Sequence, residues 1–262
     1  MILKKENGFT LIELLVVIAI IALLLSIIVP SLGKAKSYAE EIICKNNLHQ
    51  YQLVTEIYTL ENDDFLPVPQ ESIFTKDSVF TAAGETSKSC RWHNPNFELD
   101  AHPEFGGPLW PYLQTGDVSV CPVFRRLAKK MENTHKGHDG SDTGAITYSL
   151  SMNGNLQILV GPGWTFQSVR KSAVKNPSQV FLWAEENMWQ LNGLSKWPLN
   201  DTTILSGSDA LGSFHKISNA QLSAQIGSGE YNAGSCNVLM VDGSIEMVTP
   251  LDIKDLEGER MW

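Results

Sequence analysis

The spacing of apolar residues changes along the first sixty positions of the chain. Between Phe9 and Val29 every side chain is apolar except Thr10, Glu13 and Ser26. At about 1.5 Å of rise per residue, a helix over this run spans roughly 30 Å, which is enough to cross the hydrocarbon layer of a membrane. Because an ionised carboxylate is costly at that depth, Glu13 is predicted to meet a cation inside the membrane or inside a helical assembly.

Beyond this run the apolar residues return at a spacing near 3.6, which predicts an amphipathic continuation of the helix. Pro30 lies at the junction, and because it removes a backbone hydrogen bond it is predicted to bend or loosen the helix. Turn-forming residues follow Glu61, so we expect one long helix from about Phe9 to Glu61, the spine helix. The apolar positions of its second half are Leu32, Ala35, Ala39, Ile42, Ile43, Tyr51, Val54, Ile57 and Tyr58.

Short apolar or alternating runs bounded by turn residues predict strands in the rest of the chain. Asp242 and Gly243 separate the last two runs, and Asp-Gly between apolar strands is a strong hairpin signal. We therefore expect an α+β fold in which an antiparallel sheet packs against the second half of the spine helix. The expected strands cover residues 144–152, 157–160, 179–185, 235–241 and 244–248.

The amino-terminal sequence KKENGFTLIELLVV resembles the signal of type IV prepilins and type II secretion pseudopilins. The resemblance implies that a prepilin peptidase cuts between Gly8 and Phe9, that Phe9 is then N-methylated, and that the apolar segment is retained. It also implies that Glu13 pairs with the amino terminus of a neighbouring subunit. Two alternatives are a secretory signal cut near Ala19 or Ala22 and an unprocessed membrane anchor.

The same resemblance implies the organisation of the whole chain. Lys4 and Lys5 would keep the start of the helix in the cytoplasm of a bacterium, so the head would lie on the periplasmic or extracellular side of the inner membrane. The implied partners are prepilin peptidase, the inner membrane and other pilin or pseudopilin subunits. The implied segments are a removed leader (residues 1–8), a spine helix (9–61) that spans the membrane to about residue 29, and a globular head (62–262).

A second resemblance concerns the carboxyl-terminal run NVLMVDGSIEMV. It resembles the signature of a large pseudopilin-like family, namely a histidine, nine residues and Asp-Gly. Asp242 and Gly243 match the signature, but Asn232 occupies the histidine position. Either the histidine has been replaced, or His215 is its counterpart and an insertion such as residues 216–231 has moved it away.

The chain has four cysteines with no Cys-x-x-Cys spacing, so a structural zinc site is not expected. In an oxidising compartment they can form disulfides, with three complete pairings open to them. We expect one or two bridges that tie loops to the spine helix, the alternative being buried free thiols. The residues are Cys44, Cys90, Cys121 and Cys236.

No pattern of enzymatic residues stands out in the chain. There is no Gly-x-Ser-x-Gly elbow, phosphate loop or HExxH helix, so no enzyme is expected. His135, His138, Asp139 and Asp142 are close in sequence, but their aperiodic, glycine-rich setting predicts a surface loop and no metal site. No cofactor is expected. Calcium is an exception that the resemblance allows, although the acidic loop of the major pseudopilins is not found here.

Charge and aromatic content narrow the choice of partners. A formal net charge of -9 argues against nonspecific binding to nucleic acid. The basic run from Arg125 to Lys130 has helical spacing and is predicted to be a solvated helix face. The resemblance to prepilins and pseudopilins implies a structural subunit of a type IV pilus-like or type II secretion-like filament. The alternative is a membrane-tethered protein that binds polysaccharide or another surface ligand through some of its tryptophans, which are Trp92, Trp110, Trp164, Trp183, Trp189, Trp197 and Trp262.

Overall fold

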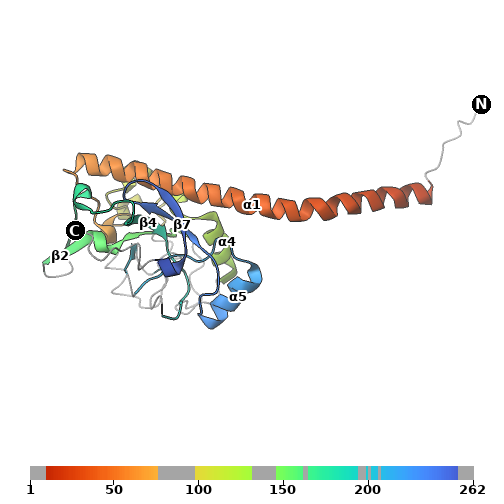
Figure 1. Cartoon of the computed structure of the whole chain (residues 1–262). Helices are drawn as coiled ribbons and strands as arrows, with labels where there is room; N and C mark the ends of the chain where they lie inside the picture. Colours follow the sequence, from red (N-terminus) through yellow and green to blue (C-terminus); the bar gives the residue numbers. More distant parts are fainter. Residues whose placement is uncertain are drawn as a thin grey trace, which may run out of the picture. The chain divides into compact units, whose positions relative to one another are not determined.

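A computed structural model describes most of the chain and groups it into two compact units (Figure 1). The first unit ends at Glu41 and the second begins at Ile42, so the boundary falls inside the long helix α1 (Leu11–Glu61). The second half of the helix thus belongs with the head. The described residues are 10–75, 98–131, 146–161, 165–193, 199, 202–205 and 208–252.

In the first unit, α1 carries the apolar run with its large hydrophobic side chains exposed. This part of the helix is long and apolar enough to cross a membrane. The described helix begins at Leu11, with Thr10 in the capping position in front of it, and Phe9 lies outside the described residues. It continues through Pro30, so the proline does not end it.

In the second unit, the 3.6-residue period of α1 is confirmed, but the predicted packed face is partly wrong. Ile42, Ile43 and Ile57 are exposed and not part of the core. The stripe that packs into the head recurs every three or four residues, as the helix geometry requires. It consists of Cys44, Leu48, Tyr51 and Val54.

A second apolar stripe explains this error. Ile42, Leu53, Ile57 and Leu60 are all exposed, and Leu60 keeps 83% of its surface. At 100° per residue these four positions lie on one side of the helix, opposite Cys44. We call them the outer face of α1. A periodic pattern shows that two apolar stripes exist but not which of them the head covers.

The helix ends at Glu61, as the turn residues after it predict. Asp63 and Asp64 take positive φ angles of 52° and 69°, which the helix cannot continue through. Asp64 then accepts a hydrogen bond from the backbone N–H of Ser172 (3.0 Å), and the backbone N–H of Leu66 donates to Val169 (3.0 Å). These bonds fix the end of α1 to the segment after β3.

The head is built on a five-stranded sheet with the order β5-β1-β4-β6-β7. Neighbours β1, β4, β6 and β7 are antiparallel, whereas β5 runs parallel to β1. The expectation of a purely antiparallel sheet is therefore wrong at this edge. β5 has only two residues, too few to show an alternating pattern. The bounds are β1 (Leu150–Asn153), β4 (Phe181–Glu185), β5 (Thr203–Ile204), β6 (Cys236–Met240) and β7 (Ile245–Val248).

Smaller elements surround this sheet. β2 (Gln157–Gly161) pairs with β3 (Thr165–Ser168), a strand that the sequence pattern did not reveal. The helices are α3 (Trp110–Leu113), α4 (Pro122–Met131) and α5 (Asn219–Ser228). The 3-10 turns are η1 (Pro69–Glu71), η4 (Pro103–Phe105), η5 (Gly116–Ser119), η6 (Gly154–Leu156), η7 (Lys171–Ala173) and η8 (Pro250–Asp252). Helix α4 carries the basic run, where Arg125 pairs with Asp117 at the surface (3.2 Å).

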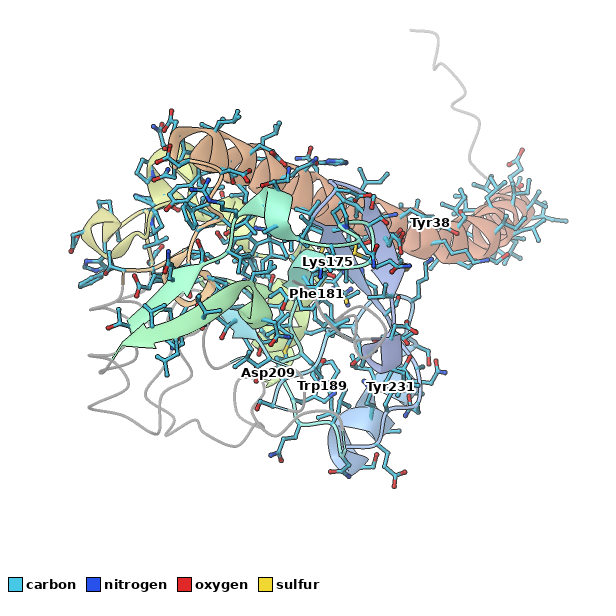
Figure 2. The ribbon with its side chains drawn as sticks, turned by 60° about the vertical axis from the view of Figure 1, so that its left-hand side comes forward. Tyr38, Lys175, Phe181, Trp189, Asp209 and Tyr231 are labelled. Atoms are coloured by element: carbon cyan, nitrogen blue, oxygen red, sulfur yellow. A yellow bond between two sulfur atoms is a disulfide. The ribbon has the colours of Figure 1, made fainter. Side chains whose placement is uncertain are left out.

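One face of the sheet packs on the second half of α1, and the other face forms a second core. Trp183 and Leu239 belong to the core that includes α1. Phe181 belongs to the second core and lies among the packed side chains of the head in Figure 2. A register shift between Phe181 and Trp183 explains why two residues two positions apart face opposite sides.

Candidate functional site

The amino-terminal segment presents Glu13 on an exposed apolar helix. The Glu13 Oε2 atom accepts hydrogen bonds from the backbone N–H of Thr10 (2.8 Å) and from its hydroxyl (2.7 Å). The Thr10 Oγ1 atom in turn accepts from the backbone N–H of Glu13 (3.3 Å). This reciprocal pair is a capping box, which stabilises the start of a helix. Sequence reasoning assigned Glu13 a role between subunits and missed this local one.

The rest of the predicted processing site cannot be placed in the same way. Gly8 and Phe9 lie outside the described residues, so the cleavage position and the pairing of Glu13 with an amine stay predictions. The Oε1 atom of Glu13 makes no hydrogen bond to any residue that the structure describes. A neighbouring subunit could therefore reach this oxygen without breaking the cap.

The carboxyl-terminal signature forms the turn between β6 and β7 and contacts the spine helix. The Asp242 Oδ1 atom accepts from the Ser244 hydroxyl (2.7 Å) and backbone N–H (2.9 Å), and these bonds hold the pKa of Asp242 below its ordinary value. Gly243 has a φ of +92°, and a β-carbon there would lie 2.1 Å from the Gln52 side chain on α1. The turn thus needs a glycine for its backbone and for the close approach of the helix.

Replacing Gly243 by alanine should lower the free energy of unfolding by about 1 to 2 kcal/mol, the cost of placing a β-carbon in left-handed backbone. Chemical unfolding of the full chain in detergent would measure it. A matched control is Gly227→Ala in α5, where a β-carbon meets nothing within 4 Å and a helical alanine gains up to about 1 kcal/mol. A Gly243→Ala protein as stable as the parent would contradict the assignment.

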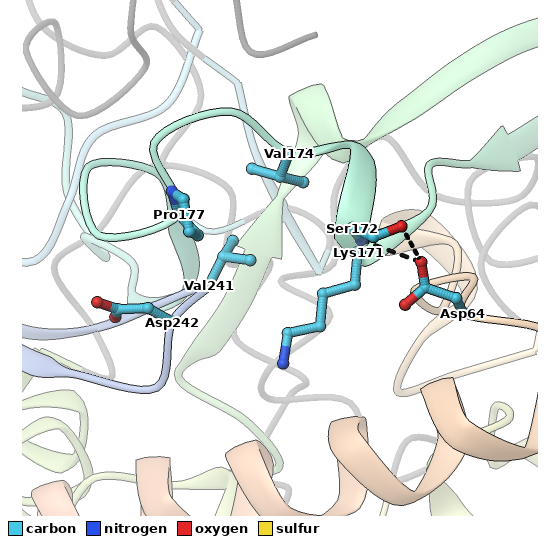
Figure 3. Close-up of a pocket in the computed structure, with 7 residues that line it drawn as sticks. All are labelled: Asp64, Lys171, Ser172, Val174, Pro177, Val241 and Asp242. Carbon is cyan, nitrogen blue, oxygen red and sulfur yellow. Dashed lines mark hydrogen bonds between the residues drawn. The ribbon is translucent and has the colours of Figure 1, made fainter.

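Asp242 also borders a pocket of about 320 Å³ that lies between the end of α1 and the hairpin (Figure 3). Ser172 donates to Asp64 across one wall and lowers the pKa of that carboxyl. Lys171 extends through the pocket in Figure 3 and bonds Glu56 of α1. Ser172 and Lys171 are each bound to a carboxylate, so the pocket joins the end of α1 to the hairpin.

Two of the three described cysteines form a disulfide that links the spine helix to the head. Cys44 of α1 and Cys121, which directly precedes α4, form a disulfide with Cα atoms 5.2 Å apart and a sequence separation of 77. In the chain-entropy model a crosslink over such a span contributes about 4 kcal/mol. Cys236 is a buried free thiol whose pKa is raised by burial. Cys90 lies outside the described residues.

The structure also bears on the histidine of the signature. His215 is buried, and its backbone exchanges hydrogen bonds with Ser235 at the start of β6 (2.9 and 3.0 Å). Asn232 instead donates to the Gln221 carbonyl of α5 (3.3 Å). Helix α5 occupies part of the segment between His215 and Ser235, and the choice between a replaced histidine and an insertion after His215 stays open.

His215 lies next to groups that sequence spacing did not connect to it. Its Nε2 atom is 3.0 Å from Glu185 Oε1 and 3.5 Å from Cys121 Sγ. These residues are 30 and 94 positions away from His215 in sequence, and no local motif relates them. Sequence reasoning named His215 and Cys121 separately and missed Glu185.

The described tryptophans form no exposed platform for a sugar ligand. Trp183 and Trp189 are buried, and Trp110 is half-buried against the core. The other four tryptophans lie outside the described residues, as does the segment with His135, His138, Asp139 and Asp142. Within the described residues, the tryptophans therefore serve packing.

An exposed apolar helix with one carboxylate near its start, continued into a half that packs on a sheet, is the architecture of a membrane-anchored, pilin-like protein. The family model described as the prokaryotic N-terminal methylation motif matches residues 3–29. The type IV wide pilus major component PilA4 of Thermus thermophilus is 36% identical over 63 residues, which cover 24% of this chain and 48% of that protein. The chain thus spans about half the length of that relative.

A second relative is covered almost completely. The type II secretion system core protein G of Vibrio cholerae is 30% identical over 158 residues, which cover 59% of this chain and 96% of that protein. No solved structure matches the chain. The chain belongs to the type IV pilin and type II secretion pseudopilin superfamily.

Proposed function

We propose that the protein is a structural subunit of a pilus-like or pseudopilus filament, processed by prepilin peptidase and assembled through α1. The observation that carries the proposal is the exposed apolar half of α1 with Glu13 near its start, within the span matched by the methylation motif. Exposure of such a surface to water is unfavourable, so lipid must cover it before the filament assembles and helices of other subunits must cover it in the filament. Both relatives are named as components of a pilus or of a secretion system.

The outer face of α1 supports assembly beyond the membrane segment. Its four exposed apolar residues lie on the part of the helix that packs on the head. A monomer gains nothing from such a stripe, whereas subunits packed along a filament would bury it. Lys4 and Lys5 would orient the subunit with its leader in the cytoplasm and its head outside the inner membrane.

A structural role also fits the chemistry of the head. In the described pocket Ser172 is bound to Asp64, Lys171 to Glu56 and Asp242 to Ser244, and the relatives carry structural names. We therefore propose no catalytic activity. The absence of a cofactor, with calcium as the exception that the resemblance allows, stays a prediction.

The proposed processing predicts a specific mature amino terminus. When the full chain is produced with a prepilin peptidase, intact mass spectrometry should show loss of residues 1–8 and the addition of one methyl group on Phe9. Replacing Gly8 by leucine should leave most of the chain uncleaved, since the resemblance places the cut directly after this glycine and leucine is much larger. Gly8→Ala is the matched control and should still be cut.

The same preparation separates the proposal from the alternatives. Filaments seen by electron microscopy and labelled by antibody against the head would support a structural subunit. A processed chain that stays monomeric in the membrane would instead favour the tethered binding protein. Recovery of the chain with residues 1–8 attached, from cells that hold the peptidase, would contradict the proposal.

A further inference from the structure

Four side chains from distant parts of the chain converge inside the head. Cys44 comes from α1, Cys121 from the residue before α4, Glu185 from the end of β4, and His215 from the segment before α5. All four are buried, and their sulfur, oxygen and nitrogen atoms lie within 4.8 Å of one another. We call this group the sulfur-histidine cluster. It belongs to none of the features used in the proposed function.

The spacing of these atoms matches a tetrahedral metal site. Zn–S bonds of about 2.3 Å and Zn–N or Zn–O bonds of about 2.0 to 2.1 Å place tetrahedral ligands roughly 3.3 to 3.8 Å apart. His215 Nε2 already lies 3.5 Å from Cys121 Sγ and 3.0 Å from Glu185 Oε1. To hold a metal, His215 Nε2 and Glu185 Oε1 would move apart by a few tenths of an ångström, and the two sulfur atoms, which the disulfide joins, would separate on reduction.

The carboxylate of the cluster is held in place by its neighbours. Glu185 Oε2 accepts a hydrogen bond from the backbone N–H of Asn237 (2.9 Å), which leaves Oε1 directed at His215. Such a fixed outer bond orients a ligating group and is typical of metal sites. The Asn237 side chain is fully buried, yet neither of its amide atoms has a hydrogen-bond partner among the described residues.

This unsatisfied amide lies on the same side of the sheet as Glu185. Residues two positions apart on a strand share one face of the sheet, so Asn237 shares a face with Leu239 on β6 and Glu185 shares a face with Trp183 on β4. Leu239 and Trp183 both pack in the core that includes α1. A buried amide without a partner costs free energy unless the site rearranges or holds a further group. The cluster therefore contains more buried polar groups than a disulfide alone requires.

We propose that Cys44, Cys121, Glu185 and His215 bind one zinc ion when the disulfide is reduced. The bridge and the metal are then alternative ways to tie α1 to the head. Two sulfurs, one imidazole nitrogen and one carboxylate oxygen form a ligand set that zinc accepts. The chain has no Cys-x-x-Cys unit, and the fold instead brings together ligands that are far apart in the sequence.

The chemistry balances with a dithiol or phosphine as the reductant. A phosphine and one water break the S–S bond, the phosphine is oxidised to its oxide with the oxygen of the water, and the two protons of the water give two thiols. A dithiol instead transfers its own two hydrogens to the two sulfurs and becomes a disulfide. Zinc then displaces both thiol protons to solvent and forms two Zn–S bonds, one bond to His215 Nε2 and one to Glu185 Oε1. The imidazole proton must sit on Nδ1 for this, so the hydrogen bond between His215 and Glu185 is replaced by their shared metal.

The test uses the full chain without a histidine tag, in detergent, carrying Cys90→Ser and Cys236→Ser so that only the two cluster cysteines remain. After reduction with a phosphine, zinc is added, the excess is removed, and bound metal is counted by mass spectrometry. The reduced protein should hold one zinc per chain and the oxidised protein none. Cobalt in place of zinc should give the visible bands of a tetrahedral site and thiolate charge-transfer bands.

Variants show whether the cluster is the site. His215→Ala and Glu185→Gln should each weaken zinc binding by the reduced protein by at least about tenfold. Because a buried substitution can prevent folding, melting of the unsubstituted protein gives an independent readout: zinc should raise the melting temperature of the reduced form and leave the oxidised form unchanged. A reduced protein that takes up no zinc, or a folded His215→Ala variant that binds it as tightly, would overturn the proposal.

Discussion

Replacing Glu13 by glutamine should reduce filament yield at least about tenfold while leaving the helix start intact. A glutamine at this position can still accept the Thr10 hydrogen bonds, since Gln serves in capping boxes as Glu does. It cannot neutralise the amine that cleavage before Phe9 would expose. Leaving that amine unpaired in an apolar surrounding costs more than the pair itself contributes. Filament yield is measured by shearing cells and quantifying the protein released.

Two further variants separate the role of Glu13 in capping the helix from its proposed pairing with the amino terminus of a neighbouring subunit. Thr10→Val removes the cap and keeps the carboxylate, so its filaments should form at close to the parental yield. Glu13→Ala removes both and should match Glu13→Gln. All three proteins should be inserted and processed, which the mass of the mature chain reports. If Glu13→Gln assembled like the parent while Thr10→Val failed, capping would be the function of Glu13 and the charge pair would be wrong.

The parts of this protein that could be predicted from its sequence are those encoded by neighbouring residues. The apolar run of α1 and its end at Glu61 follow from short stretches of sequence. The Asp242–Gly243 hairpin does so too, because its two strands are adjacent along the chain. Each depends on contacts within a few residues or across one tight turn.

The parts that could not be predicted depend on residues far apart. The convergence of Cys44, Glu185 and His215 is produced by the packing of α1 on the sheet and leaves no local spacing to recognise. The parallel pairing of β5 with β1 likewise depends on a distant two-residue segment. The buried stripe of α1 was misassigned because the helix has two apolar sides, and only the head determines which one is covered.

Replacing Trp183 by alanine should cost about 3 to 5 kcal/mol in free energy of unfolding, the largest loss we expect for a single residue of the head. Trp183 is fully buried, and its ring centroid lies 4.6 Å from that of Tyr51 on α1. Its indole N–H donates to Thr55 Oγ1 (3.1 Å), and Tyr51 is hydrogen-bonded to Ser119 (2.8 Å). Alanine would leave a cavity between the sheet and the helix and a buried hydroxyl without its donor.

Comparison of substitutions shows which of these losses dominates. Trp183→Phe keeps an aromatic ring against Tyr51 but removes the N–H, so it should cost less than the alanine variant and more than the roughly 1 kcal/mol of one hydrogen bond. Leu60→Ala, on the outer face of α1, should change the stability of the monomer by less than about 0.5 kcal/mol. Urea unfolding of the oxidised full chain in detergent gives all three values. Because 3 to 5 kcal/mol is a large part of the stability of an ordinary domain, Trp183→Ala should leave the head close to unfolding even with the disulfide intact. A Trp183→Ala protein no less stable than Leu60→Ala would mean that this contact does not hold the spine helix on the sheet.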